Sequence, residues 1–164
     1  MKNIVRSNIY MPMAAMILAA ALAVPAAAQK QVPFKGAIQG HDVDSGYNGT
    51  TVVVTTTGTG IGTLLGEFSF TQEVTVNIAA STDTGSAHWI AANGDSIDAT
   101  IVGSGEPTAT PNVISITEIY TITGGTGRFA GAQGSFTVER LANAATFLTS
   151  GSFHGTITSP GAAH

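Results

Sequence analysis

Apolar and polar residues alternate with a period of two along most of this chain, which is typical of β-strands that bury one face. The clearest case runs from about residue 65 to residue 78. Apolar side chains, among them Phe68 and Phe70, occupy one face of this segment, and polar side chains such as Glu67 and Glu73 occupy the other. The pattern therefore predicts a long strand that is buried on one side.

The same reasoning predicts further strands with mostly short connections. Turn-forming residues, chiefly Gly, Pro, Asn and Asp, separate the alternating segments. No stretch sustains a 3.6-residue period flanked by caps, so long helices are not expected. The expected strands lie at about residues 34–40, 50–57, 65–78, 86–92, 95–103, 112–123, 135–141 and 146–158.

The connections favour an antiparallel sheet that closes on itself. Asn93-Gly94 predicts a hairpin with a type I′ turn, in which both residues have positive φ. Residues 41–48 and 104–111 are expected to be loops, and Gly58-Thr59-Gly60 is expected to end a strand. Parallel pairing needs crossovers of about a dozen residues, for which the chain has no room. We therefore expect an all-β, eight-stranded antiparallel closed barrel, with a two-sheet sandwich as the alternative.

The amino-terminal segment has the pattern of a secretory signal peptide. Lys2 and Arg6 precede an apolar run over residues 13–24, and the small residues Ala26 and Ala28 suit cleavage after Ala28. The alternative is an uncleaved anchor, but the apolar run is shorter than the roughly 20 residues that span a membrane. We therefore expect a signal peptide over residues 1–28, a single β-barrel domain over residues 29–164, and a secreted or periplasmic location.

Charge and composition exclude several classes of partner and chemistry. Cleavage removes Lys2 and Arg6, two of the six basic residues, and none of the ten acidic ones, so the formal net charge falls from −4 to −6. This charge disfavours nucleic acid and anionic lipid, so we expect no nucleic-acid partner and no membrane attachment after cleavage. The chain has no cysteine, which excludes disulfides, a thiol nucleophile and thiolate metal sites.

A glycine-rich segment between the sixth and seventh expected strands carries a family resemblance. Residues 124–134 read GGTGRFAGAQG. This stretch resembles the Gly-Gly-x-Gly-x-Phe-x-x-Ala/Val-x-Gly segment of plant dirigent proteins and allene oxide cyclases, with matches at Gly124, Gly125, Gly127, Phe129, Ala132 and Gly134. The residues themselves predict one short helical turn over 128–132, which would place Phe129 as a plug at one end of the barrel.

The resemblance implies a fold and a mode of action. It implies a calycin-like antiparallel barrel of eight strands with an apolar interior, assembled as a homotrimer and free of metal and organic cofactors. Allene oxide cyclases steer ring closure of an unstable fatty-acid epoxide, and dirigent proteins steer the coupling of phenolic radicals made by another enzyme. The matched segment is structural in that superfamily, so it identifies no catalytic residue here.

The strand pattern singles out Glu118 as the most informative residue. Glu118 shares a face with Ile116 and Tyr120, so its carboxylate is expected inside the barrel, where it must be paired or protonated. Arg140 and Gln72 also lie on inward faces, and Glu118 and Arg140 are therefore expected to pair. The functional interpretation is a polar anchor or general acid at the bottom of a ligand pocket. The alternative is a buried structural pair or a charge at the barrel mouth.

Two aromatic residues are further candidates. Tyr120 and Trp89 each combine an apolar body with a polar group, which suits the lining of the same pocket, although both also suit an ordinary core. His88 and His154 lie on polar strand faces and are expected to be solvated. The histidines lack the close spacing of a zinc site, so we expect no metal.

These features predict an exported barrel that binds a small apolar ligand or serves as a structural or interaction module. The alternative is an isomerase-like, cyclase-like or dirigent-like protein that steers the reaction of a hydrophobic substrate in the barrel interior without a cofactor. A hollow interior would favour this alternative, whereas an interior filled by aromatic rings would leave no room for a substrate. The candidate ligand-binding residues are Glu118, Arg140, Tyr120, Gln72 and Trp89.

Overall fold

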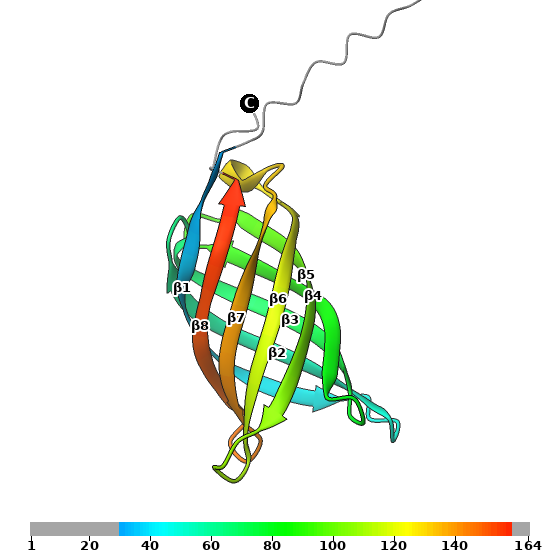
Figure 1. Cartoon of the computed structure of the whole chain (residues 1–164). Helices are drawn as coiled ribbons and strands as arrows, with labels where there is room; N and C mark the ends of the chain where they lie inside the picture. Colours follow the sequence, from blue (N-terminus) through cyan, green and yellow to red (C-terminus); the bar gives the residue numbers. More distant parts are fainter. Residues whose placement is uncertain (1–29, 159–164) are drawn as a thin grey trace, which may run out of the picture.

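The computed structural model describes residues 30–158, which form an all-β barrel with one short 3₁₀ helix (Figure 1). The expected signal peptide lies outside the described residues. Within residues 30–158, no helix is long and apolar enough to cross a membrane. In chain order the elements are β1 (Gln31–Ser45), β2 (Thr51–Gly62), β3 (Gly66–Asn77), β4 (Thr82–Ala91), β5 (Ser96–Pro107), β6 (Val113–Gly125), η1 (Gly127–Phe129), β7 (Gly134–Asn143) and β8 (Leu148–Thr158).

The sheet closes through pairing of its first and last strands. Each strand pairs antiparallel with the next, and β8 pairs with β1 from Gln31↔Thr158 to His41↔Leu148. Figure 1 shows β1 in blue beside β8 in red. This pairing confirms the eight-stranded antiparallel closed barrel and excludes the two-sheet sandwich. Closure also pairs the two strand edges that an open sheet would expose.

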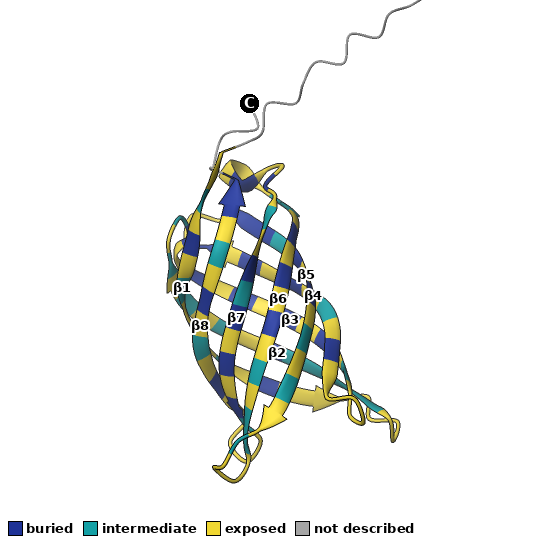
Figure 2. Ribbon diagram, viewed as in Figure 1, coloured by how far each residue is buried: buried dark blue, intermediate teal, exposed yellow. Residues whose placement is uncertain are grey.

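Inward side chains fill the end of the barrel that η1 covers. Buried and exposed residues alternate along the strands, as Figure 2 shows. The aromatic residues buried at this end pack ring against ring (Phe34, Phe68, Phe70, Trp89, Tyr120, Phe136 and Phe153). Phe129 of η1 is fully buried in the same core, which confirms that it plugs one end of the barrel.

Strand β2 continues to Gly62, so the prediction that it ends at Gly58-Thr59-Gly60 is wrong. Gly58 and Gly60 face the interior opposite aromatic side chains. A Cβ atom at Gly58 would lie 2.6 Å from Phe70 Cε1, and one at Gly60 would collide with the ring of Phe68. These glycines therefore make room for two rings inside the barrel instead of ending the strand.

We expect Gly58→Ala to lower the free energy of unfolding by about 1–3 kcal/mol, because the new methyl group would collide with Phe70 and with the backbone oxygen of Gln39. Urea denaturation followed by circular dichroism measures the change. Gly124→Ala is the matched control, since a Cβ at Gly124 meets no atom within 4 Å. Equal stability of the two variants would contradict this explanation of the inward glycines.

The hairpin at Asn93-Gly94 is confirmed, but its turn is not type I′. Residues 92–95 connect β4 to β5, and only Gly94 of the two has positive φ, at 89°. Asn93 Oδ1 accepts a hydrogen bond from the backbone N–H of Asp95, and Asn93 Nδ2 donates to Asp95 Oδ2 at 2.8 Å. The Asn93 side chain thus stabilises a turn longer than the two-residue type I′ turn, and the Asn93 backbone does not adopt a positive φ.

Two aspartates that the sequence pattern assigned to connections lie on strands instead. Strand β1 continues to Ser45 and β4 begins at Thr82. As a result Asp42 and Asp83 face the interior, with residue exposures of 8% and 6%. The barrel interior therefore contains two more acidic side chains than the predicted pair of Glu118 and Arg140.

Candidate functional site

A cavity of about 320 Å³ lies inside the barrel, at the end opposite to η1. Its volume falls at the lower end of the range for small-molecule sites. The wall is mostly apolar and comes from the ends of several strands (Val52, Val54, Val74, Val76, Ile114, Ile116 and Ala142), with Ile78 and Phe147 from turns at the mouth. The interior is therefore filled at one end and hollow at the other.

A buried polar layer separates the two ends. Every strand except β5 contributes a buried polar side chain to it (Asp42, Thr56, Gln72, Asp83, Glu118, Arg140 and Thr149). Strand β5 contributes Gly103 at this level. A Cβ there would lie 2.6 Å from Glu118 Cγ and 2.8 Å from Asp83 Oδ1, so glycine leaves space for both carboxyl groups.

Glu118 and Arg140 form a bidentate ion pair at the centre of this layer. Arg140 Nε donates to Glu118 Oε2, and Arg140 Nη2 donates to Glu118 Oε1, each at 3.1 Å. Glu118 is fully buried, and the side chain of Arg140 is 3% exposed. The planar fork of a guanidinium matches a carboxylate in this way, which fixes the orientation of both groups.

Arg140 also links the pair to the cavity side. Its Nη1 donates to Asp42 Oδ2 at 3.3 Å and to Thr149 Oγ1 at 3.1 Å, while Thr56 Oγ1 donates to Asp42 Oδ1 at 2.6 Å. Burial by itself lowers the pKa of Arg140, but the charge and hydrogen bonds of Glu118, together with Asp42, outweigh it and raise the pKa above its ordinary value. Arg140 is therefore a permanent cation in this layer.

Tyr120 and Gln72 complete the hydrogen bonding of Glu118 on the aromatic side. The Tyr120 hydroxyl donates to Gln72 Oε1 and also lies 3.3 Å from Glu118 Oε2. Gln72 Nε2 donates to Glu118 Oε1 at 3.3 Å. Burial and then the negative charge of Glu118 raise the pKa of Tyr120 well above its ordinary value. Tyr120 is thus a neutral hydrogen-bond donor that supports the carboxylate.

Asp83 differs from the rest of the layer because it lacks a partner. Its Oδ1 is buried and has no hydrogen-bond partner among residues 30–158. Burial, and then repulsion from Glu118, raise the pKa of Asp83 from 3.8 to about 6, although the positive charge of Arg140 acts in the opposite direction. Asp83 also lines the cavity.

The structure places the five candidate residues at three depths. Arg140 lines the cavity. Glu118, Gln72 and Tyr120 lie behind it and hold it in place through the hydrogen bonds described above. Trp89 lies in the aromatic core, stacked on Phe68 with ring centroids 4.7 Å apart and away from the cavity.

Sequence reasoning missed the acidic groups around the cavity. Asp42, Asp44 and Asp83 all line it. A signal for two of them was present, since Asp42 lies four residues after the inward Ile38, and Asp83 lies four residues before the inward Ala87. Extension of the period-two pattern through these polar residues would have placed both inside the barrel.

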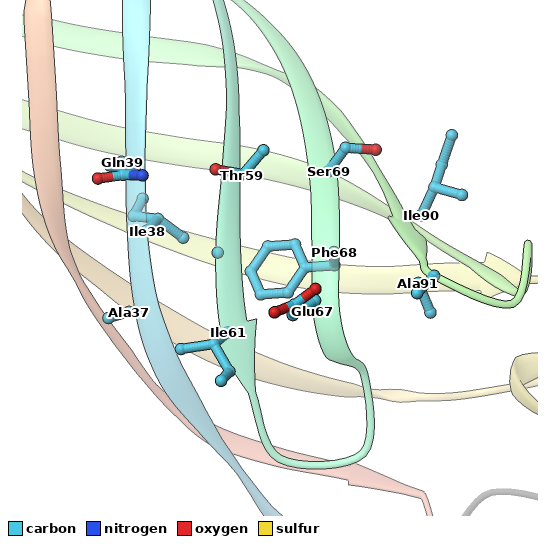
Figure 3. Close-up of a pocket in the computed structure, with 12 residues that line it drawn as sticks. Ala37, Ile38, Gln39, Thr59, Ile61, Glu67, Phe68, Ser69, Ile90 and Ala91 are labelled. Atoms are coloured by element: carbon cyan, nitrogen blue, oxygen red, sulfur yellow. The ribbon is translucent and has the colours of Figure 1, made fainter.

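The outer surface offers a weaker candidate. An open hollow of about 860 Å³ lies over the outside of β1–β4. Figure 3 draws the residues that line it, among them Gln39, Thr59 and Ser69. Glu67 is its charged residue. His88, expected in solvent, is exposed on this same side of the sheet, where its Nδ1 pairs with Asp98 Oδ1 at 2.6 Å. Within residues 30–158, no group of three or more His, Cys, Asp or Glu side chains is placed to hold a metal ion.

The fold and the site together define a closed antiparallel β-barrel with a cavity in its lumen. A solved structure described as the pterocarpan synthase dirigent protein GePTS1 matches with a TM-score of 0.52 and 11% sequence identity, over 80% of this chain and 93% of that one. This likeness supports the dirigent-like barrel fold that the glycine-rich segment indicated. No protein-family model matches the chain, and no curated protein sequence matches it.

Proposed function

We propose that this protein binds a small, mostly apolar molecule in the hollow end of its barrel. The observation that carries the proposal is the cavity itself, about 320 Å³ in volume, with valine and isoleucine walls and a polar floor. Ligand sites in proteins combine these features, since apolar contact supplies affinity and a few fixed polar groups supply orientation. The signal-like amino terminus supports binding outside the cytoplasm.

The polar floor supports this function because its groups are held in place before a guest arrives. Glu118, Gln72 and Tyr120 fix Arg140 from behind, Asp42 fixes it from the cavity side, and Thr149 accepts a further hydrogen bond from its Nη1. A rigid site loses little conformational entropy on binding. In this proposal Glu118, Gln72 and Tyr120 are positioning residues, Arg140 contacts the guest, and Trp89 stabilises the core.

A second candidate function is the steering of a guest's reaction. The dirigent-like fold supports it, and so does Asp83, whose pKa of about 6 suits exchange of a proton with a guest near neutral pH. The matched structure is described as a pterocarpan synthase dirigent protein, and that description belongs to that protein. Binding is the first step of either function, so the binding experiment applies to both.

We expect the neutral fluorescent probe N-phenyl-1-naphthylamine to bind this protein at one site, and Val54→Phe to weaken that binding at least about tenfold. Val54 lines the cavity on β2, so the larger ring would occupy the space of the guest. Val102→Phe is the matched control, because Val102 is 61% exposed on the outside of β5. A fluorescence titration measures both affinities.

The outcome is decided by the comparison of the two variants. Weakened binding in Val54→Phe with unchanged binding in Val102→Phe supports a site in the lumen. Absence of binding to the unsubstituted protein, or equal affinities of the two variants, overturns the proposed function.

A further inference from the structure

The charges that line the cavity are unbalanced. Asp42, Asp44 and Asp83 contribute three carboxyl groups, and Arg140 contributes one guanidinium. Glu118, directly behind the floor, adds a further buried carboxylate. An apolar cavity strengthens the influence of these charges on a guest, since its low dielectric screens them less than water does. The electrostatics therefore favour a positive guest over a negative one.

Arg140 has little capacity left to hold an anion. Its Nε and Nη2 donate to Glu118, and its Nη1 donates to both Asp42 and Thr149. Four of the five guanidinium N–H groups are thus engaged within the protein. A carboxylate guest would find one free N–H and would lie beside Asp83 and Asp42, which repel it.

Asp83, unlike Arg140, still has hydrogen-bonding capacity. The residue is buried, with 6% of its surface exposed, and its Oδ1 accepts no hydrogen bond within residues 30–158. Gly103 opposite it keeps open the space that a Cβ would take. A buried, unpaired carboxyl group is costly to the fold. Oδ1 is itself enclosed, but Asp83 lines the cavity, so a group that enters the cavity can approach the carboxyl group at its other oxygen, Oδ2.

We infer that the guest is an apolar amine that binds as its ammonium cation, with its N–H groups on the Asp83 carboxylate and its apolar body against the valine and isoleucine wall. This inference rests on the proposed function and names its ligand class. An ammonium group donates a charge-assisted hydrogen bond to the carboxyl oxygen of Asp83 that faces the cavity, and it also neutralises part of the negative charge around the cavity. A neutral alcohol supplies only the hydrogen bond, and a carboxylate supplies neither.

Three probes that share one apolar body test this inference. They are 1-naphthylmethylamine, 1-naphthalenemethanol and 1-naphthoate, which carry a cationic, a neutral and an anionic group respectively. At pH 7.5 we expect the amine to bind at least about tenfold more tightly than the alcohol, and the alcohol more tightly than the carboxylate. Isothermal titration calorimetry measures the affinities, and NMR shifts of the Val54 and Val74 methyl groups report binding in the lumen.

Asp83→Asn is the decisive variant, and Asp98→Asn is its matched control. Asp98 lies on the outside of β5 with its side chain 49% exposed, so its replacement changes the net charge equally without touching the cavity. We expect Asp83→Asn to lower the affinity for the amine at least about tenfold while that for the alcohol changes little, and Asp98→Asn to change neither.

The results separate the inference from the function on which it rests. If all three probes shift the Val54 and Val74 methyl signals with equal affinity, or if the preference for the amine survives in Asp83→Asn, the inference is wrong while binding in the lumen stands. If none of the three probes and no N-phenyl-1-naphthylamine binds, the proposed function itself is wrong.

Discussion

Replacement of Arg140 by methionine should lower the free energy of unfolding by about 3–5 kcal/mol. Glu118 is fully buried and receives two hydrogen bonds from Arg140, so the variant would leave an uncompensated carboxylate inside the barrel. Tyr120 and Gln72 remain beside Glu118 but carry no positive charge to replace the guanidinium. Equilibrium denaturation in urea at pH 7 measures the loss.

A surface pair and a double variant show whether burial is the cause. Arg128→Met removes an ion pair with Asp95 in which the arginine side chain is 41% exposed, and it should cost less than about 1 kcal/mol. The double variant Glu118→Leu with Arg140→Met should recover part of the lost stability, because it removes the stranded Glu118 carboxylate and leaves Asp42 without its guanidinium partner. A double variant as unstable as Arg140→Met alone would show that the stranded Glu118 carboxylate does not cause the loss.

The barrel itself was predictable because each strand carries its own period-two pattern. Alternation of the kind seen at Phe68 and Phe70 determines which face is buried, whatever the neighbouring strands are. The short connections then exclude parallel pairing. A closed barrel differs from a sandwich in that its first strand pairs with its last. This pairing, for example of Phe34 with Gly155, joins residues far apart in the sequence, so the pattern within each strand does not predict it.

The limits of the site prediction have a common physical cause. Glu118 stood out because it interrupts an apolar face, and its pairing with Arg140 in the structure agrees with that expectation. Asp42 and Asp83 went unnoticed because each lies near a strand end, where polar residues usually indicate a connection. Inward glycines such as Gly58 were taken as strand ends for the same reason, although each makes room for a large side chain.

The location of the cavity could not be derived from residue types alone. Both ends of the barrel are lined by apolar side chains, and only side-chain volume distinguishes them. Aromatic rings around Trp89 fill the end near η1, whereas valines and isoleucines such as Val54 and Ile116 leave the other end hollow. Assignment of a side chain to one end requires the register between strands, which the structure supplies.

Removal of the Asp83 carboxylate should stabilise the protein at neutral pH and remove one part of its pH dependence. The pKa of Asp83 is raised from 3.8 to about 6, so between these values the folded state binds more protons than the unfolded state. The contribution of Asp83 to the free energy of unfolding is therefore fully present below about pH 4, and it is lost as the pH rises through 6, the pKa in the folded state. The shift corresponds to a loss of roughly 2–3 kcal/mol.

Burial is the largest cause of the raised pKa of Asp83, and the charged groups that face it modify this effect. Glu118 repels the ionised form, and Arg140 attracts it but is already neutralised by Glu118 and by Asp42 on its other side. Burial adds to the repulsion, so ionisation is unfavourable on balance. Asp83→Asn should therefore match the unsubstituted protein in stability near pH 4 and exceed it by roughly 2–3 kcal/mol at pH 7.5.

Urea denaturation of both proteins between pH 4 and pH 8 tests this dependence. The other carboxyl groups titrate in both proteins, so they cancel in the difference between them. A constant difference across this range, or greater stability of the unsubstituted protein at pH 7.5, would mean that Asp83 is partnered within the fold. A difference that grows with pH would instead mean that the protein keeps a carboxylate that destabilises its own fold, which is the expected cost of a group retained to meet a cationic guest.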